Sequence, residues 1–335
     1  MRLNVILITI VLGGLISGAA FFIFGYPVNV QTANLVAEPL SGGQARLSFR
    51  TGAEGTISQR ESENLGGQAF LLPVAETNYS PVRDFNILEP VIEARAAVLY
   101  DVNSGRFLYA HNVNKRFPIA SVTKLITAIV VMDNFNLDDI YTVPAENVNV
   151  DGFGADLYRG ERLKGADLFK IMLIKSSNDA ALTFATQAQS QGIDLEAKMN
   201  EKARQLGMTN THFSDPAGLD DQDAFSTAAD LIKLVSYAAG YDLISELLTT
   251  RVADVTSVDG RISHHLINTN QLLGQITGII VGKTGHTDSA LGTMVLEVGI
   301  DTGGERLISV VLGSSDRFGE TRKLIELGKK AYSWK

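Results

Sequence analysis

The chain has 335 residues, a formal net charge of −8 and no cysteine. These features exclude disulfide bonds, a thiol nucleophile and cysteine-ligated metals, and they are compatible with an extracytoplasmic protein. The acidic balance, with no basic run, argues against nucleic acid as a partner, and the histidines show no metal-ligand spacing. The adjacent pair His264-His265 is expected in a loop or at the surface.

The first predicted element is the apolar run from Leu3 to Phe24, which is long enough to cross a bilayer as a helix. Arg2 precedes this run, and by the positive-inside tendency the rest of the chain is expected outside the cytoplasm. A cleaved signal peptide is the alternative, with Ser17-Gly18-Ala19 as its cleavage site, although apolar residues continue beyond that point. We favour an uncleaved, single-pass anchor in the cell membrane over a secreted form.

A flexible tether is predicted after the anchor. Residues 28–86 contain repeated glycines and show no sustained periodicity. Within this stretch, Phe70-Leu71-Leu72-Pro73-Val74 is apolar enough to dock on the domain that follows.

Ser121-Val122-Thr123-Lys124 opens a predicted buried helix, because an apolar run continues to Met132. Residues three apart share a helix face, so Ser121 Oγ and Lys124 Nζ can meet. A serine becomes nucleophilic when a base takes its proton. Lys124 can be that base only if burial, or a cation such as Lys283, lowers its pKa. On this motif alone, the simpler interpretation is an N-cap serine and an ordinary lysine.

An irregular link is predicted at Ser176-Ser177-Asn178, between helices expected over 165–174 and 179–189. Side chains two apart on a helix point in opposite directions, so only an irregular link lets Ser176 and Asn178 serve one site. There Ser176 could relay a proton to a leaving amine, and Asn178 could bind a substrate amide. Capping of the second helix by Ser177 or Asn178 is the alternative, and it is compatible with catalysis.

Strands are predicted from 278, over 290–300 and over 306–313, followed by a last helix over 320–332 that packs on the sheet. Lys283-Thr284-Gly285 lies in the first of these strands. Lys283 supplies charge and Thr284 a hydroxyl for a terminal carboxylate. Gly285 would allow a bound peptide to approach the backbone as an added strand.

In this order the three triplets match the motif set of serine acyl-transfer enzymes that act on D-alanyl peptides and β-lactams. From about Pro90 to Lys335 the chain resembles the D-alanyl-D-alanine carboxypeptidase family, the low-molecular-mass penicillin-binding proteins. Further segments match the family pattern: 94–101, 104–109, 199–200, 206–213, 218–220, 226–231 and 268–270.

The resemblance implies an α/β (α+β) fold, the serine penicillin-recognising fold shared with β-lactamases and transpeptidases. An antiparallel sheet flanked by helices would combine a hairpin over 94–111 with strands over 279–313. A mostly helical subdomain over 126–250 would form the opposite wall of a cleft. The expected organisation is an anchor or signal peptide over 1–26, a tether over 27–87 and a catalytic domain over 88–335.

The resemblance implies roles for individual residues. Three side chains would be catalytic: Ser121 as the acyl-accepting nucleophile, Lys124 as its general base and Ser176 as the proton shuttle. Six residues would bind substrate: Asn178, Lys283, Thr284, Gly285, His286 and Arg317. Of these, Lys283, Thr284 and Arg317 would hold the carboxylate end. The N–H groups of Ser121 and His286 would form the oxyanion hole.

The implied activity is removal of the terminal D-alanine from peptidoglycan stem pentapeptides, with β-lactams as covalent inhibitors. No cofactor or metal is expected, because proton transfer and an oxyanion hole suffice for acyl transfer. A DD-endopeptidase would use the same groups. A β-lactamase would need a carboxylate such as Glu196 to activate water, but Glu196 is expected in mid-helix and too close to Ser176. A catalytically inactive, wall-anchored scaffold is the remaining alternative.

Two departures from the family pattern stand out. Leu291 follows Ala290 where the family usually has glycine, and its bulk could alter which substrates fit. Asp215-Pro216-Ala217-Gly218 replaces the commoner Asn-Pro-His-Gly. Neither departure is expected to touch a catalytic group.

Overall fold

The computed structural model describes residues 34–39, 45–50, 80–148, 157–300 and 304–334. The chain divides into two units, residues 1–77 and 78–335. In the first unit, strand β1 (Asn34–Pro39) pairs antiparallel with β2 (Ala45–Arg50), so this part of the predicted tether contains a hairpin. The predicted anchor and the apolar segment 70–74 lie outside the described residues. Within them, no helix is both long and apolar enough to span a bilayer.

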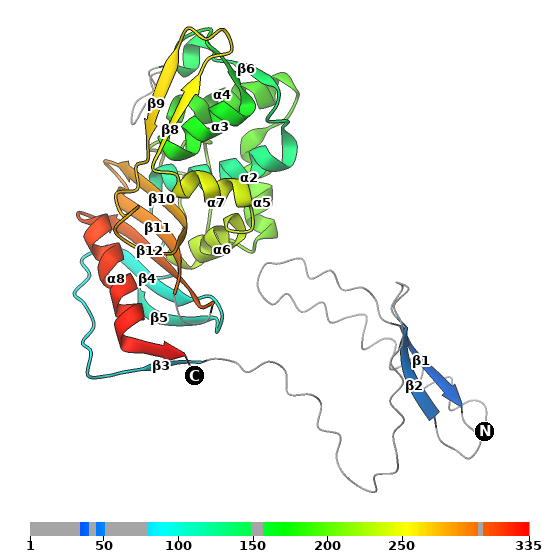
Figure 1. Cartoon of the computed structure of the whole chain (residues 1–335), viewed down its shortest axis with the longest axis vertical. Coiled ribbons are helices and arrows are strands. Elements are labelled where there is room, and N and C mark those ends of the chain that lie inside the picture. Colours follow the sequence, from blue (N-terminus) through cyan, green and yellow to red (C-terminus); the bar gives the residue numbers. More distant parts are fainter. Residues whose placement is uncertain (1–33, 40–44, 51–79, 149–156, 301–303, 335) are drawn as a thin grey trace, which may run out of the picture. The chain divides into compact units, whose positions relative to one another are not determined.

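A five-stranded antiparallel sheet, in the order β10-β11-β12-β4-β5, forms the centre of the second unit (Figure 1). Its strands come from both ends of that unit: β4 (Ala96–Asp101), β5 (Arg106–His111), β10 (Ile279–Thr287), β11 (Leu291–Gly299) and β12 (Arg306–Ser314). Pairing of β12 with β4 joins the two sets. The predicted hairpin and C-terminal strands are thus confirmed, and β10 lies at an edge of the sheet.

Helices cover both faces of this sheet (Figure 1). Helix α8 (Arg317–Ala331) packs on one face against β4, β11 and β12. The opposite face meets the helical part of the unit, in which α6 contacts the same three strands. That part comprises η1 (Ala120–Thr123), α2 (Lys124–Asn134), η2 (Ala145–Asn147), α3 (Gly165–Ile174), α4 (Asn178–Ser190), α5 (Leu195–Gln205), α6 (Ala228–Ala238) and α7 (Asp242–Thr249).

Three short antiparallel pairs complete the second unit. They are β6 (Ile140–Thr142) with β7 (Arg162–Lys164), β8 (Val252–Thr256) with β9 (Ser263–Ile267), and β3 (Pro81–Arg83) with β13 (Tyr332–Trp334). Because β3 pairs with the C-terminal strand, the last residues of the range expected to be a tether belong to the second unit.

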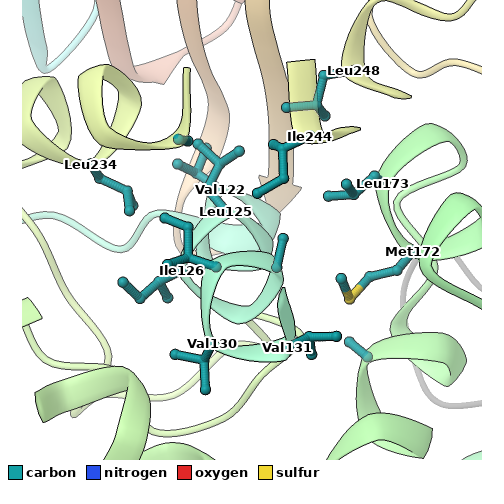
Figure 2. Packing of buried hydrophobic residues seen from close by; sticks show 14 of the residues in the cluster. Val122, Leu125, Ile126, Val130, Val131, Met172, Leu173, Leu234, Ile244 and Leu248 are labelled. Carbon is teal, nitrogen blue, oxygen red and sulfur yellow. The ribbon is translucent and has the colours of Figure 1, made fainter. Parts of the chain in front are cut away.

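Helix α2 lies at the centre of the helical part, and its apolar side chains are buried, except Met132, which is partly buried. Figure 2 shows Leu125 and Ile126 of α2 among residues of three other helices, including Met172 of α3, Leu234 of α6 and Ile244 of α7. A helix enclosed in this way cannot move without displacing its neighbours, since protein interiors are close-packed. The first turn of α2 is therefore a rigid platform for the residues that precede it.

Three sequence predictions about local structure were wrong. The last helix begins at Arg317 rather than Glu320, because the Asp316 side chain accepts a hydrogen bond from Gly319 N and caps it earlier. Glu196 lies in the first turn of α5, not in mid-helix, because Asp194 caps that helix. His264 lies in β9 and is buried, with its Nε2 2.6 Å from Glu161 Oε1.

Truncating a core leucine of α2 should destabilise the protein strongly. Leu125 is 0% exposed, so we expect Leu125→Ala to lower the free energy of unfolding by about 3 kcal/mol, from lost burial and a residual cavity. Leu88, which is 85% exposed, is the matched control, and Leu88→Ala should change stability by less than about 0.5 kcal/mol. Urea unfolding followed by circular dichroism measures both, and equal losses would contradict the packing described.

A buried carboxyl in β11 should make stability depend on pH. Burial raises the pKa of Glu297 to about 7, although Arg306 Nη1 lies 3.0 Å from its Oε1 and opposes the shift. Because the folded pKa is raised, the neutral form stabilises the fold, and this stabilisation is lost as pH rises from the ordinary value of 4.5 to about 7. We expect Glu297→Gln to remove about 3 kcal/mol of pH dependence over that range. Exposed Glu326→Gln is the control, and identical pH profiles for wild type and Glu297→Gln would refute the effect.

Candidate active site

Ser121 lies in the short turn η1, immediately before α2, and is only partly buried. The residue before it, Ala120, has a φ of +47°, a left-handed conformation that is strained for a non-glycine residue. Gly218 packs directly against the Ala120 carbonyl, where any side chain would collide. On another side, Thr293 of β11 donates a hydrogen bond of 3.1 Å to the carbonyl of Ile119. The turn that carries Ser121 is thus held by two other segments.

Lys124 is fully buried, and its Nζ donates three hydrogen bonds. The acceptors are Ser121 Oγ at 3.0 Å, Asn178 Oδ1 at 2.6 Å and the carbonyl oxygen of Ala217 at 2.6 Å. Residues three apart at this helix start do meet, as the sequence predicted. Asn178 Oδ1 and the Ala217 carbonyl oxygen carry no proton and only hold the amine in place. The contact with the Ser121 hydroxyl is therefore the one along which a proton can move to Lys124.

The electrostatic setting favours a neutral Lys124. Burial lowers the pKa of its amine to about 7, while the carboxylates of Asp215 and Asp179 act in the opposite direction. The sequence analysis named Lys283 as a cation that could lower this pKa. Burial, the other cause that the sequence analysis named, is the leading one. The repulsion between the two amines lowers the pKa of Lys283 instead.

The link between α3 and α4 brings Ser176 and Asn178 to one site. Ser176 has a φ of +62°, so the chain turns sharply there and the link is irregular, as predicted. Ser177 caps α4 by accepting a hydrogen bond of 3.1 Å from Ala180 N. Capping and presentation of the flanking side chains therefore coexist in this link.

Lys283 and Thr284 extend the site along edge strand β10. Lys283 is almost completely buried, and its Nζ donates to Ser176 Oγ at 2.6 Å and to the carbonyl of Thr284 at 2.8 Å. Burial and the neighbouring charges of Lys124 and Arg317 lower the pKa of Lys283 well below its usual value. The Thr284 hydroxyl lies 2.7 Å from that of Thr269, a partner that the sequence analysis did not identify.

Arg317 and His286 lie further along the same edge of the site. The aliphatic part of Arg317 crosses Gly292 of β11, and the register pairs Gly292 with His286 of β10. Arg317 Nε is buried and has no hydrogen-bond acceptor among the described residues. His286 is exposed on β10.

Gly285 has a structural role that the sequence analysis did not identify. A Cβ atom there would lie 2.9 Å from the Ile119 carbonyl and 3.0 Å from Ala120 Cβ. The missing side chain therefore makes room for the turn that carries Ser121. The approach of a bound peptide to Gly285 stays a prediction.

The expectation that segment 215–218 touches no catalytic group was also wrong. The Ala217 carbonyl accepts a hydrogen bond from Lys124, and Asp215 influences the charge of that lysine. Every residue has a backbone carbonyl, so the residue type at position 217 could not predict this contact. The only sequence signal for it was that the segment adjoins Gly218-Leu219-Asp220, which matches the family pattern.

Leu291, the other departure, has a φ of +54°. This left-handed conformation explains why glycine is usual at the position, since a leucine there carries strain of about 1–2 kcal/mol. Its side chain is only partly buried, at the end of β11. Among the described residues, no group of three or more histidine, aspartate or glutamate side chains is arranged to hold a metal.

Comparison with known proteins agrees with this geometry. A family model described as D-alanyl-D-alanine carboxypeptidase matches residues 84–316. Carboxypeptidase DacF of Bacillus subtilis is 29% identical over 248 residues, which cover 72% of this chain and 63% of DacF. A D-alanyl-D-alanine endopeptidase of Escherichia coli is 31% identical over 248 residues, covering 72% of this chain and 80% of that protein. The crystal structure of a Streptomyces DD-transpeptidase has a TM-score of 0.67 at 27% identity, covering 72% of this chain and 99% of that structure.

The likeness to the Streptomyces transpeptidase confirms the predicted penicillin-recognising fold. The chain spans less than two thirds of the length of DacF. The family match contains all three motifs and every predicted site residue except Arg317, which follows it directly. With most of its length inside that match, the chain belongs to the D-alanyl-D-alanine carboxypeptidase family.

Proposed function

We propose that the chain is a serine-type D-alanyl-D-alanine carboxypeptidase that removes the terminal D-alanine from peptidoglycan stem peptides. The observation that carries this proposal is the contact of 3.0 Å between Lys124 Nζ and Ser121 Oγ, with the amine fixed by two further acceptors. A buried lysine with a pKa of about 7 is partly neutral near neutral pH and can take the serine proton.

Acylation follows from this arrangement. Ser121 Oγ attacks the carbonyl carbon of the penultimate D-alanine while its proton passes to Lys124 Nζ. The N–H groups of Ser121 and His286 stabilise the oxyanion, and the C–N bond then breaks. Ser176 donates its hydroxyl proton to the leaving amine. It regains a proton from Lys283, whose Nζ lies 2.6 Å from Ser176 Oγ. Water then cleaves the acyl-serine ester and releases the shortened peptide.

The carboxylate end of the substrate fits the positive side of the site. Lys283 and Arg317 are close enough to depress the pKa of Lys283, so an anion between them would relieve their repulsion. Thr284 adds a hydroxyl donor. Asn178 would bind the peptide amide, and its contact with Lys124 supports this role by bringing it to the site. β-Lactams, which carry a carboxylate beside a reactive amide, are the corresponding covalent inhibitors.

Endopeptidase action on peptide cross-links is a second candidate, favoured by the similarity to the Escherichia coli endopeptidase. The β-lactamase alternative has less support. Glu196, its proposed water-activating carboxylate, lines a separate cavity with Asn147 and Thr186, and no residue of the three motifs lines that cavity.

The location of the enzyme rests on the sequence alone. The proposed arrangement is a single-pass anchor over 1–26, a tether over 27–87 and a catalytic domain outside the cytoplasm, where peptidoglycan is available. A secreted form, after cleavage near Ser17-Gly18-Ala19, is the alternative.

Removing the Ser121 hydroxyl should abolish covalent labelling and catalysis. We expect the full chain, kept in mild detergent, to be labelled by a fluorescent penicillin and to release D-alanine from a stem pentapeptide. Ser121→Ala should lose both activities by at least about 1000-fold, because no other group can form the ester. Ser333→Ala, at an exposed serine of β13, is the control. Unchanged labelling of Ser121→Ala would refute the assignment, and an inactive wild type would favour the scaffold alternative.

The rate of acylation should follow the titration of Lys124. Because the neutral amine is the base, the second-order rate of penicillin labelling should rise about tenfold per pH unit on the acid side and level off above pH of about 7. Stopped-flow measurements between pH 5 and 9 test this. A rate that is independent of pH over the acid half of the range would exclude Lys124 as the titrating base.

A further inference from the structure

Asp215 lies in the loop between α5 and α6, at the head of a tight turn. Its Oδ1 accepts hydrogen bonds from Ala217 N and Gly218 N, both at 2.7 Å, and its Oδ2 accepts one of 3.1 Å from Leu219 N. A single carboxylate thus satisfies three consecutive backbone donors. A carboxylate is well suited to this, since it offers only acceptors.

The turn that Asp215 orders contacts the reactive centre at three points. The Ala217 carbonyl accepts the 2.6 Å hydrogen bond from Lys124 Nζ. The Pro216 carbonyl accepts one of 2.7 Å from Thr127 Oγ1, which ties the turn to α2. Gly218, with a φ of +74°, packs under the Ala120 carbonyl beside the nucleophile. Loss of the turn would therefore release one of the acceptors that hold Lys124.

The charge of Asp215 acts on the same lysine. The charged groups that influence or adjoin Lys124 are Asp215 from this loop, Asp179 from the first turn of α4 and Lys283 from β10. Burial of Lys124 favours its neutral form, and the two carboxylates favour the charged form. Burial raises the pKa of Asp215, but the three N–H donors and Lys124 oppose that shift.

We propose that Asp215 is a positioning residue for acylation: it orders the 215–219 turn that holds Lys124 through Ala217, and its negative charge shifts to higher pH the range in which Lys124 accepts the serine proton. This inference rests on the proposed function, because it assumes that Lys124 is the base. The asparagine that is commoner in the family would retain an acceptor oxygen for Ala217 N and Gly218 N but would carry no charge. The aspartate therefore adds an electrostatic effect to a turn that either residue could form.

The test is the pH dependence of penicillin labelling in Asp215→Asn. Without the carboxylate, Lys124 should lose its proton at lower pH, so the acid limb of the rate profile should move to lower pH by about one unit. At a fixed pH on that limb, the labelling rate of the variant should then be about tenfold higher than that of the wild type. This gain is partly offset because the less basic amine lowers the maximal rate reached at high pH. A purely structural role would lower the rate at every pH without moving the limb.

Asp221→Asn is the matched control, since it removes the same charge from an exposed position of the same loop. Asp215→Ser, which keeps a hydroxyl acceptor but no charge, gives an independent measurement if the asparagine variant does not fold. All rates are measured well below the melting midpoint of each variant. An unmoved limb in the folded Asp215 variants, or an equal shift in Asp221→Asn, overturns the inference. A wild type that penicillin does not label overturns the proposed function instead.

Discussion

The structure of the site depends on burying one amine. Lys124 has no access to solvent, so each of its N–H donors must find a protein acceptor, and the three acceptors come from separate segments of the chain. They are the turn that precedes α2, the start of α4 and the loop after α5. The same burial that requires these partners also lowers the pKa of the amine to about 7. Position and reactivity of the lysine thus have one physical cause.

Close backbone approach holds the remaining parts around this lysine. Gly218 and Gly285 contact the turn that carries Ser121 from two directions. A side chain at either glycine would collide with that turn and displace it. Among the described residues, three of the four non-glycine positions with positive φ belong to or adjoin the site: Ala120, Ser176 and Leu291. Such conformations persist only where surrounding contacts enforce them, and they concentrate where geometry matters for chemistry. The close-packed core around α2 supplies that enforcement (Figure 2).

The sequence predicted a large part of this arrangement. Ser121 and Lys124 meet because a helix begins there, and local periodicity was enough to show it. The strands over 278–313 were predicted from their apolar runs, whereas the five-stranded sheet that joins them to the 94–111 hairpin was implied by the family resemblance. Other features lacked a local signature. The role of the Ala217 carbonyl cannot be predicted from the residue type, because every residue has a backbone carbonyl. His264 is buried against Glu161, which lies far away in the sequence. The start of α8 was misplaced because Asp316 caps the helix through a single side-chain contact.

Motif identity and order, and with them the chemistry available to the chain, were determined by the sequence alone, because the side chains of serine, lysine and asparagine have fixed functional groups. Tertiary structure alone decided which of these groups share a site and in which protonation state. Ser121 and Lys283 lie far apart along the chain, and their chemistry depends on burial and on charges contributed by other segments. Sequence spacing does not encode burial or distance between remote residues, so the pKa of Lys124 and the role of Asp215 emerge only when the chain is folded.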